Sequence, residues 1–478
     1  MANSPPVLVL GATGYIGGRL VPQLIRARHN VRVLVRNRAK LEGRPWFEQV
    51  EIFEGDVLQP ETLDKAISGC HVLYYLIHSM KSGADFENMD RRAAINVLNA
   101  AEKNNLKRII YLGGLGRRDI GQSSHLRSRH EVGDILRSGK ISVTELRAAV
   151  VIGSGSLSFE MIHHLVNRLP AMICPRWVYT RTQPIAIRDV LAYLVQSLSR
   201  EETSGLTIDI GGPDIVSYRD MMLGVAKTLG LKRYMIPVAV LTPRLSSYWV
   251  NLVTPIQAGL AKALIDSLRS ETICENNIAL EVFGFKPISF MEAIELALER
   301  VRDHKVETTW TSATATSSQP IDPSHLKEDR REIDVPVSAG ELFKIIASIG
   351  GNNGWYYANW LWKLRGFIDQ QLGGVGLRRG RRHPYEICPG EALDFWRVQE
   401  FIPSRKITLL AEMKVWGQAW LEFKVYPISD SSCRLEQIAR YYPRGLFGLF
   451  YWYAIYPLHT IVFRGLIKAI ADRALNYE

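Results

Sequence analysis

Cysteine is scarce in this chain of 478 residues. The cysteines lie far apart, no Cys-x-x-Cys pair occurs, and their odd number does not suit a disulfide framework. They are Cys70, Cys174, Cys274, Cys388 and Cys433. A small disulfide-stabilised secreted scaffold is therefore excluded, and we expect a reducing, cytoplasmic environment.

Signatures of several other protein classes are also missing. The segment from Met1 to Pro6 is short and polar, and it does not resemble the apolar core of a secretory signal peptide. No zinc motif, helix-turn-helix or RNP-like aromatic strand accompanies the basic residues, so we expect no nucleic-acid partner. His163 and His164 lie on a presumed helix, and because they are adjacent their side chains point apart. No third candidate ligand is apparent, so the sequence predicts no metal site.

Acidic residues are fewer than basic ones. The chain has 59 Lys and Arg against 48 Asp and Glu, a formal net charge of +11, while 47% of its residues are hydrophobic and 22% are charged. This composition is typical of soluble globular proteins, and the length suits two to four domains. The basic excess fits an anionic partner such as a nucleotide or acidic lipid, or else a diffuse basic surface.

Only one long hydrophobic run occurs, from Gly445 to Phe463, and it has no charged residue apart from the titratable His459. Its length reaches the threshold of about 18 residues for a membrane-spanning helix. We expect a terminal helix buried against its own domain. The alternatives are a weak contact with a membrane surface, which Arg444 and Arg464 at its ends would suit, and a true span.

The first part of the chain alternates short apolar runs with amphipathic stretches. This alternation predicts an α/β fold, a Rossmann-type doubly wound parallel sheet with helices on both faces. The expected strands are Val7–Leu10, Val31–Val35, Val50–Phe53, Val72–Ile77, Lys107–Leu112, Val143–Leu146, Pro184–Ile187 and Leu206–Ile210. The expected helices are Tyr15–Arg28, Phe86–Lys103, Leu126–Arg137, Tyr218–Leu229 and Phe290–Arg302.

Three parts follow from the change in pattern along the chain. Residues 1–303 form the predicted dinucleotide-binding domain, and residues 304–330 a linker rich in Ser and Thr. Residues 331–478 form a second domain, in which two helical stretches precede alternating strands and a long terminal helix. That alternation of apolar and polar residues is typical of antiparallel strands with one buried face.

The strongest functional signal is the glycine-rich segment between the first strand and first helix. It reads Gly11, Ala12, Thr13, Gly14, Tyr15, Ile16 and Gly17. Glycines there permit a tight turn and a close approach of the backbone to a pyrophosphate, which the N-terminus of the helix then stabilises. The segment therefore predicts a site for a dinucleotide cofactor.

The second strand ends at Arg36, where an NAD site usually has an acidic residue for the ribose 2′-hydroxyl. An arginine there suits a 2′-phosphate, and Arg38 adds a second positive charge. We therefore predict NADP(H) in preference to NAD(H); the alternative is a solvated basic turn with no role in binding.

The segment TGYIGGRL, the Gly55-Asp56-Val57 step and the helix that contains Asn96 resemble the short-chain dehydrogenase/reductase superfamily. More narrowly, they resemble its atypical, NmrA-like NAD(P)-binding branch, over roughly Val7 to Val301. The resemblance implies that Asp56 and Val57 line the adenine pocket. It also implies that Leu76, Ile77 and His78 border the cofactor.

The sequence departs from that family at its catalytic positions. Active members have a Ser after the fifth strand and a Tyr-x-x-x-Lys helix, whereas this chain has Leu112-Gly113-Gly114, and His125 and Arg129 at the Tyr and Lys positions. His125 is predicted to donate a proton, assisted by Arg129. The alternatives are a cofactor or ligand contact, or an incidental surface residue on a helix that only shapes the pocket.

The second domain resembles the helix-grip, or START/polyketide-cyclase-like, architecture, again an α+β arrangement. The resemblance implies an apolar cavity between a sheet and a long helix, and the many tryptophans of this half suit either a cavity lining or an ordinary core. The cluster Arg378 to Arg382 suits a phosphate or an anionic lipid.

Taken together, the motifs predict an NADP(H)-binding oxidoreductase that reduces a small hydrophobic carbonyl or enone. The alternatives are a non-catalytic NAD(P)-binding sensor or scaffold, and a carrier of a hydrophobic ligand through the second domain. The expected location is the cytoplasm, with attachment to the membrane periphery as the alternative.

Overall fold

The computed structural model describes residues 5–42, 44–78, 85–118, 123–238, 265–303, 306–308, 326–377, 380–381 and 383–476. The chain forms two compact units. The first comprises Met1–Arg38 and Pro45–Ala313, and the second comprises Ala39–Arg44 and Thr314–Glu478. Most of the Ser/Thr-rich stretch, and three residues of the Arg378 to Arg382 cluster, lie outside the described residues.

A seven-stranded parallel sheet forms the centre of the first unit, in the order β11-β6-β5-β4-β1-β2-β3. Its strands are β1 (Val7–Leu10), β2 (Val31–Val35), β3 (Glu51–Glu54), β4 (Val72–Tyr75), β5 (Arg108–Gly114), β6 (Ser142–Ala148) and β11 (Thr207–Ile210). Every residue of β1, β2 and β4 is buried, as strands covered on both faces should be. The predicted Rossmann-type fold is thus confirmed.

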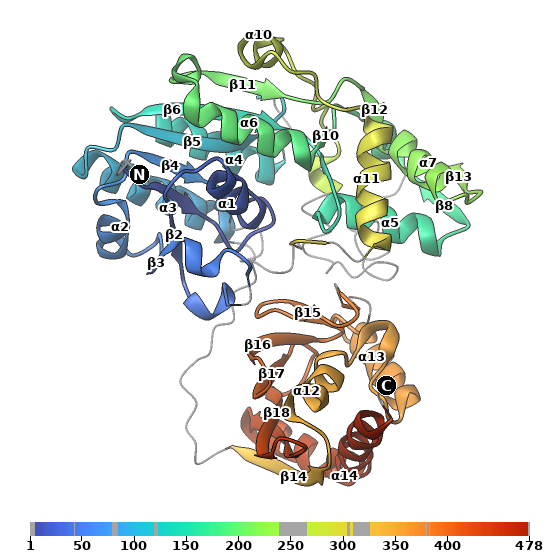
Figure 1. Ribbon diagram of the computed structural model, residues 1–478. Helices are drawn as coiled ribbons and strands as arrows, with labels where there is room; N and C mark the ends of the chain where they lie inside the picture. The colour runs from blue at the N-terminus through green and yellow to red at the C-terminus, as the bar shows by residue number, and fades with distance from the viewer. Residues whose placement is uncertain are drawn as a thin grey trace. The chain divides into compact units, whose positions relative to one another are not determined.

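Helices cover both faces of this sheet (Figure 1). They are α1 (Gly17–Arg26), α2 (Pro60–Ile67), α3 (Phe86–Lys103), α4 (Ser124–Arg137) and α6 (Ile187–Ser199). Helix α1 contacts α6, whereas α3 contacts both α2 and α4. The strand order reverses between β1 and β4, and ligands of open α/β sheets bind outside the carboxyl ends of the strands at such a point.

The later part of the first unit has its own core, formed mainly by α5 (Leu157–Arg168), α7 (Tyr218–Thr228) and α11 (Phe290–Arg302). The remaining elements here are β7 (Val151–Ile152), β8 (Ala171–Cys174), β9 (Arg181–Thr182), β10 (Ile185–Ala186), β12 (Val216–Ser217), β13 (Tyr234–Pro237) and α10 (Ile278–Phe283). The sequence patterns predicted α7 and α11, and a helix without bounds was presumed at His163 and His164 of α5; α6 was not predicted.

The second unit contains a six-stranded antiparallel sheet in the order β14-β19-β18-β17-β16-β15. The strands are β14 (Lys327–Val335), β15 (Ala392–Leu393), β16 (Trp396–Ile402), β17 (Lys406–Ala411), β18 (Gly417–Ser429) and β19 (Ser432–Pro443). Alternate residues such as Leu421, Phe423 and Val425 face the core, so the predicted alternation of buried and polar side chains is confirmed.

Three helices accompany this sheet: α12 (Ala339–Ala347), α13 (Asn359–Gln371) and α14 (Gly445–Leu475). The capping box of Ser338 and Glu341 begins α12, which packs with α14 against the sheet (Figure 1).

The expectation that the run from Gly445 to Phe463 is buried against its own domain is wrong for most of that run. From Val462 onward, α14 contributes residues such as Phe463, Leu466 and Ile470 to the core. Most residues from Gly445 to Ile461 are exposed, and only 22% of the most apolar window of the helix is buried. By length and composition, α14 is the one helix among the described residues that is apolar enough to cross a membrane.

Candidate functional site

The glycine-rich segment is held in a conformation that only glycine permits at two positions. Gly11 has a φ of 93°, and a Cβ atom there would lie 2.7 Å from the Leu76 carbonyl oxygen. A Cβ atom on Gly17 would lie 2.3 Å from the Gly11 carbonyl oxygen. The loop is therefore a tight cradle between β1, β4 and the start of α1, and the residues fit the dinucleotide for which the sequence predicts it.

The N-terminus of α1 is kept open for an anion. Ile16 precedes the helix without a capping side chain, and the first turn has no acidic residue. Helix N-termini attract negative charge through their backbone N–H groups and dipole. The middle of the predicted segment, from Ala12 to Tyr15, lies directly in front of this end.

A buried arginine that the sequence analysis did not single out supports the segment from behind. Arg19 is 2% exposed, and it donates hydrogen bonds to Thr308 Oγ1 at 2.8 Å and to the Ser154 carbonyl at 2.8 Å. Thr308 Oγ1 in turn donates to the Tyr15 carbonyl at 2.9 Å. The contact joins residues nearly 300 positions apart, so no local pattern could have revealed it.

The two predicted phosphate-binding arginines differ in their surroundings. Both are exposed beyond the end of β2. The Arg38 guanidinium lies 5.1 Å from the centre of the Phe47 ring, and its backbone N–H donates to Glu54 Oε1 at 2.6 Å. Arg38 is therefore packed against its own unit, and Arg36 is the better placed of the two for a group bound at the strand end.

The loop after β3 is fixed by hydrogen bonds at the positions that the resemblance assigned to the adenine pocket. Asp56 Oδ1 accepts the Leu58 N–H at 3.0 Å, and Asn96 Nδ2 of α3 donates to the Val57 carbonyl at 3.0 Å. The Asp56 carboxylate thus orders its own turn, and Asn96 ties that turn to α3.

Beyond β4, the segment Leu76, Ile77 and His78 leads into a chain of buried and half-buried polar side chains. His78 Nδ1 lies 2.8 Å from Asp90 Oδ2 of α3, and His78 Nε2 lies 2.9 Å from His125 Nδ1 of α4. Ser128 Oγ donates to the same Asp90 oxygen at 3.0 Å. The structure therefore brings together two residues that the sequence predicted separately, His78 and His125, with Asp90 behind them.

The chemistry of the acceptor determines the tautomers of this histidine relay, which consists of Asp90, His78 and His125. An ionised carboxylate only accepts, so a neutral His78 carries its proton on Nδ1 and offers the Nε2 lone pair to His125 Nδ1–H. The His125 Nε2 atom is then left as a proton acceptor that the relay does not use.

Burial keeps both imidazoles neutral. It lowers the pKa of His125 well below its usual range, and His78 and Arg129 lower it further. Burial also lowers the pKa of His78, against the opposing effect of its hydrogen bond to Asp90. Protonating this pair is costly, and the Asp90 carboxylate reduces that cost.

Arg129 lies one turn beyond His125 but has a partner of its own. Its guanidinium donates to the Leu112 carbonyl and lies 5.4 Å from the centre of the Tyr111 ring. Arg129 is thus packed against the end of β5, and its positive charge lowers the pKa of His125.

Two glycines stand where a serine would end the fifth strand. A Cβ atom on Gly113 would lie 2.8 Å from the buried Glu145 Oε1, and one on Gly114 would lie 3.1 Å from a Leu126 methyl group. A serine side chain at either position would require the Glu145 or Leu126 side chain to shift. Within the described residues, no group of three His, Cys, Asp or Glu side chains is placed to hold a metal.

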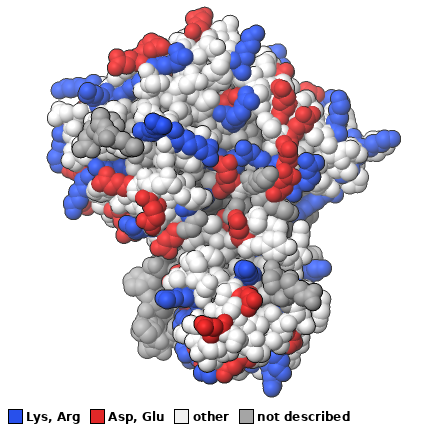
Figure 2. Space-filling view, viewed as in Figure 1, with Lys and Arg blue, Asp and Glu red and all other residues white. Residues whose placement is uncertain are grey.

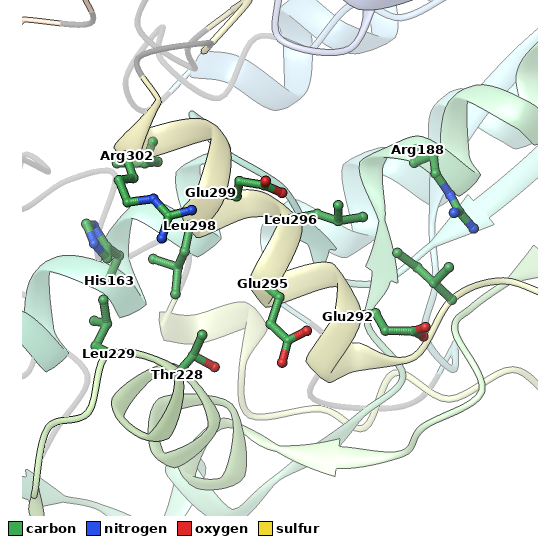
Figure 3. A pocket seen from close by; sticks show the side chains of 12 residues that line it. His163, Arg188, Thr228, Leu229, Glu292, Glu295, Leu296, Leu298, Glu299 and Arg302 are labelled. Carbon is green, nitrogen blue, oxygen red and sulfur yellow. The ribbon is translucent and has the colours of Figure 1, made fainter.

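A separate hollow of about 660 Å³ lies in the later part of the first unit, along α11 (Figure 3). Its walls include His163, Glu295, Glu299 and Arg302. None of its lining residues belongs to the glycine-rich segment or the histidine relay, so we do not assign it to the cofactor site.

Comparison with protein families divides the chain in the same way. Residues 11–152 match a family described as NAD(P)H-binding, and residues 323–466 match a family described as a protein of unknown function, DUF2867. The first match supports a nicotinamide cofactor and a reductase-like role for the first unit.

Curated relatives also match the first unit. The chain is similar to a ceramide reductase of Caulobacter vibrioides, with 28% identity over 273 residues, which is 54% of this chain and 82% of that protein. It is 29% identical over 118 residues to a cinnamoyl-CoA reductase 1 of Oryza sativa, which is 23% of this chain and 34% of that protein. The chain thus spans about a third of the length of the plant enzyme.

Solved structures share the fold of the first unit. A triphenylmethane reductase of Citrobacter sp. aligns with a TM-score of 0.51 and 20% identity, over 62% of this chain and 99% of that one. A nucleoside-diphosphate-sugar epimerase of Staphylococcus aureus aligns with a TM-score of 0.50 and 16% identity, over 61% and 99%. At this identity the likeness concerns the fold alone.

Proposed function

We propose that the protein is an NADP(H)-dependent oxidoreductase that interconverts a hydrophobic carbonyl compound or enone and its reduced form. The observation that carries the proposal is the histidine relay, which begins two residues beyond the contact between Leu76 and the glycine cradle. A hydrophobic substrate is favoured because the chain is similar to a protein named ceramide reductase, and ceramide is a lipid. The NmrA-like branch remains our assignment within this group of proteins.

In this proposal the relay handles the proton of the reaction. A bound nicotinamide supplies or accepts the hydride. When an alcohol is oxidised, its hydroxyl proton passes to His125 Nε2, while His125 Nδ1–H passes its proton to His78 Nε2. The product is an imidazolium at His78 beside the Asp90 carboxylate, 2.8 Å away, so the buried charge is paired. Reduction runs the same transfers backward and places a proton on the substrate oxygen.

The preference for NADP(H) is proposed from Arg36. Its position after β2 suits a ribose 2′-phosphate, and its side chain is exposed there. We expect Arg36→Ala to weaken NADPH binding about tenfold, equivalent to about 1.4 kcal/mol, and to leave NADH binding unchanged. Arg26→Ala is the matched control, because Arg26 is exposed in the last turn of α1, at the other end of that helix from the cradle.

The test of the whole proposal combines binding and turnover. The purified protein is titrated with NADPH and with NADH by calorimetry, and NADPH oxidation is followed over a panel of hydrophobic ketones, aldehydes and enones. We expect His125→Ala to lower kcat by at least about 10²-fold while the Kd for NADPH is retained. Binding of neither cofactor contradicts the proposal. Binding without turnover of any compound supports the alternative, a sensor or scaffold, which the missing Ser and Tyr favour.

A second candidate function rests on the second unit, for which we propose a helix-grip-like architecture that binds a small hydrophobic ligand. A cavity of about 440 Å³ lies between α13, α14 and the sheet, and its lining is mostly aromatic and aliphatic. Two polar atoms in its lining residues are buried without a hydrogen-bond partner, Trp396 Nε1 and His459 Nδ1. They suit a ligand with an apolar body and one polar group.

A fluorescent polyene fatty acid is the probe for this cavity. We expect it to bind to the full chain, and Ile455→Trp, which fills the cavity from α14, to weaken binding at least about tenfold. The matched control is Ile461→Trp, an exposed position on the same helix that does not line the cavity. Equal binding by both variants contradicts the assignment of this cavity.

A further inference from the structure

The second unit carries an exposed apolar surface that the oxidoreductase chemistry does not use. We name it the aromatic face, and it is formed by one side of α13, by Trp416 and by the first half of α14. Its members are Trp360, Leu364, Phe367, Trp416, Leu446, Phe447, Phe450, Tyr453 and Ile461. The exposed fraction is 67% for Trp360, 77% for Phe447 and 74% for Phe450, far from the burial that such side chains favour.

Contacts within the unit join these segments. A Cβ atom on Gly448 of α14 would lie 2.2 Å from the Trp416 carbonyl oxygen, so the helix lies directly on that loop. Exposed residues from all three segments, Leu364, Trp416 and Leu458, also line the 440 Å³ cavity. The aromatic face therefore surrounds a cavity whose rim is apolar and accessible.

The charges around the face are of one sign. Within residues 359–372, 413–418 and 444–464, all of which the structure describes, the one acidic residue is Asp369, and its side chain is fully buried. The exposed cations in the same segments are Lys363, Lys414, Arg444 and Arg464. On the view in Figure 2, basic and acidic side chains are elsewhere interspersed over the molecule. The surface around the aromatic face thus complements an anionic one.

We propose that the aromatic face docks on the surface of an anionic lipid bilayer and that the cavity takes an apolar lipid chain from it. Aromatic side chains rimmed by Lys and Arg are typical of helices that lie in the interfacial region of a bilayer. The proposal goes beyond the oxidoreductase activity, and it describes a cytoplasmic protein attached at the membrane periphery.

Geometry favours attachment to the surface over a span. The exposed part of α14 runs from Gly445 to Ile461, about 25 Å at 1.5 Å per residue, whereas a bilayer core is about 30 Å thick. The rest of the helix is fixed in the core of its own unit. Even within the exposed part, Trp452 stacks on Tyr441 of β19 at 5.6 Å, so one side of the helix is already occupied by protein.

The first experiment measures sedimentation of the full chain with vesicles of phosphatidylcholine, with and without phosphatidylglycerol. We expect binding to the anionic vesicles that weakens as salt is raised. The triple variant Phe447→Ser, Phe450→Ser and Tyr453→Ser should lose at least about tenfold in partitioning. The control is Tyr385→Ser with Ile428→Ser, which removes exposed side chains of the same unit outside the face. Equal partitioning of the triple variant, the control and the unaltered chain overturns the proposal.

A second arm separates bilayer docking from the other occupants of such a face. Light scattering of the lipid-free protein reports whether a second copy covers it: a dimer that the triple variant dissociates, with no vesicle binding, overturns the proposal. Retention of the cellular protein in membranes after extraction at high pH overturns it in favour of a span. Unchanged thermal unfolding of the triple variant, expected because its positions are exposed, shows that lost binding is not lost folding.

Discussion

The two large sheets among the described residues position their ligand sites in opposite ways. In the first unit, parallel strands buried on both faces place the candidate chemistry at their carboxyl ends, on loops that follow β1 and β4 directly. In the second unit, an antiparallel sheet has one apolar face, and the cavity lies between that face and helices from distant parts of the chain. The glycine cradle of the first unit is thus encoded locally, whereas its histidine relay and the cavity of the second unit depend on packing between distant segments.

The largest effect that this difference predicts is on a glycine of the cradle. Gly17→Ala places a Cβ atom 2.3 Å from the Gly11 carbonyl oxygen, so the backbone has to move where a pyrophosphate would lie. We expect NADPH binding to be lost, by more than about 100-fold, and the first unit to be destabilised by a few kcal/mol. Calorimetric titration and thermal unfolding measure the two effects. If the unfolding transition of the second unit moves as well, the two units are not independent.

Asp90 provides the next largest effect. Asp90→Asn keeps the shape of the side chain but removes the charge that pairs with an imidazolium at His78. We expect kcat to fall by about 10²-fold with no change in the Kd for NADPH, because Asp90 acts through His78. Asp85→Asn, just before the start of α3, is the control.

The pH profile distinguishes this role of Asp90 from a merely structural one. Because burial lowers the pKa of His125, the protonated relay that reduction needs becomes more populated as pH falls from 8 toward 6. Reduction should therefore accelerate over that interval and oxidation should be nearly constant. Asp90→Asn should move the pH at which reduction levels off to a lower value, because the imidazolium at His78 loses its counter-charge; a plateau at an unchanged pH would show that Asp90 has no part in the proton transfer.

The contrast between the units also explains what the sequence alone could reveal. The glycine segment, the parallel sheet and helices such as Phe86–Lys103 follow from local spacing, and the structure contains the predicted sheet and helices. His78 and His125 could each be proposed as a site residue, but the contact between them could not be predicted. They are 47 positions apart, and only the fold brings their rings together. The helix presumed at His163 and His164 could not be given bounds even though Ser156 caps α5, because a cap without a long periodic pattern is a weak signal.

The same limit explains the error at α14. The apolar run shows how long and how hydrophobic the helix is. Neither property distinguishes a helix buried in a core from an exposed one. What differs is the surface available to cover it, and the sheet and α12 cover only the half from Val462 onward. Such an outcome depends on the sizes of other elements, which the sequence of the helix does not contain.

Lowering the pH should destabilise the first unit more than the second. Among the described residues of the first unit, seven histidines have a pKa lowered by burial, to about 4 for His130 and about 3 for His164; the others are His29, His71, His78, His125 and His163. In the second unit, burial lowers the pKa of His459 to about 4. Each such group is neutral when folded and takes up a proton on unfolding below pH about 6.5, so each destabilises by up to about 1.4 kcal/mol per pH unit as pH falls further.

Calorimetry from pH 7 to 5 checks this order of stability. The transition that NADPH shifts upward identifies the first unit. We expect that transition to fall faster with pH than the other one. Parallel shifts of the two transitions would contradict the assignment of the buried histidines.

The smallest predicted effect is on a glycine of the second unit and is opposite in sign to that of Gly17→Ala. Gly340 lies in the first turn of α12, it has no positive φ, and nothing lies within 4 Å of where its Cβ atom would be. Alanine restricts the unfolded chain and favours the helix, so Gly340→Ala should stabilise this unit by about 0.5 kcal/mol. This value is at the lower end of the usual range because the site is near the N-terminus of the helix. Chemical denaturation followed by tryptophan fluorescence, which is dominated by the second unit, measures the change. A loss of stability would show that α12 needs the freedom of glycine at this position, as the cradle does at Gly17.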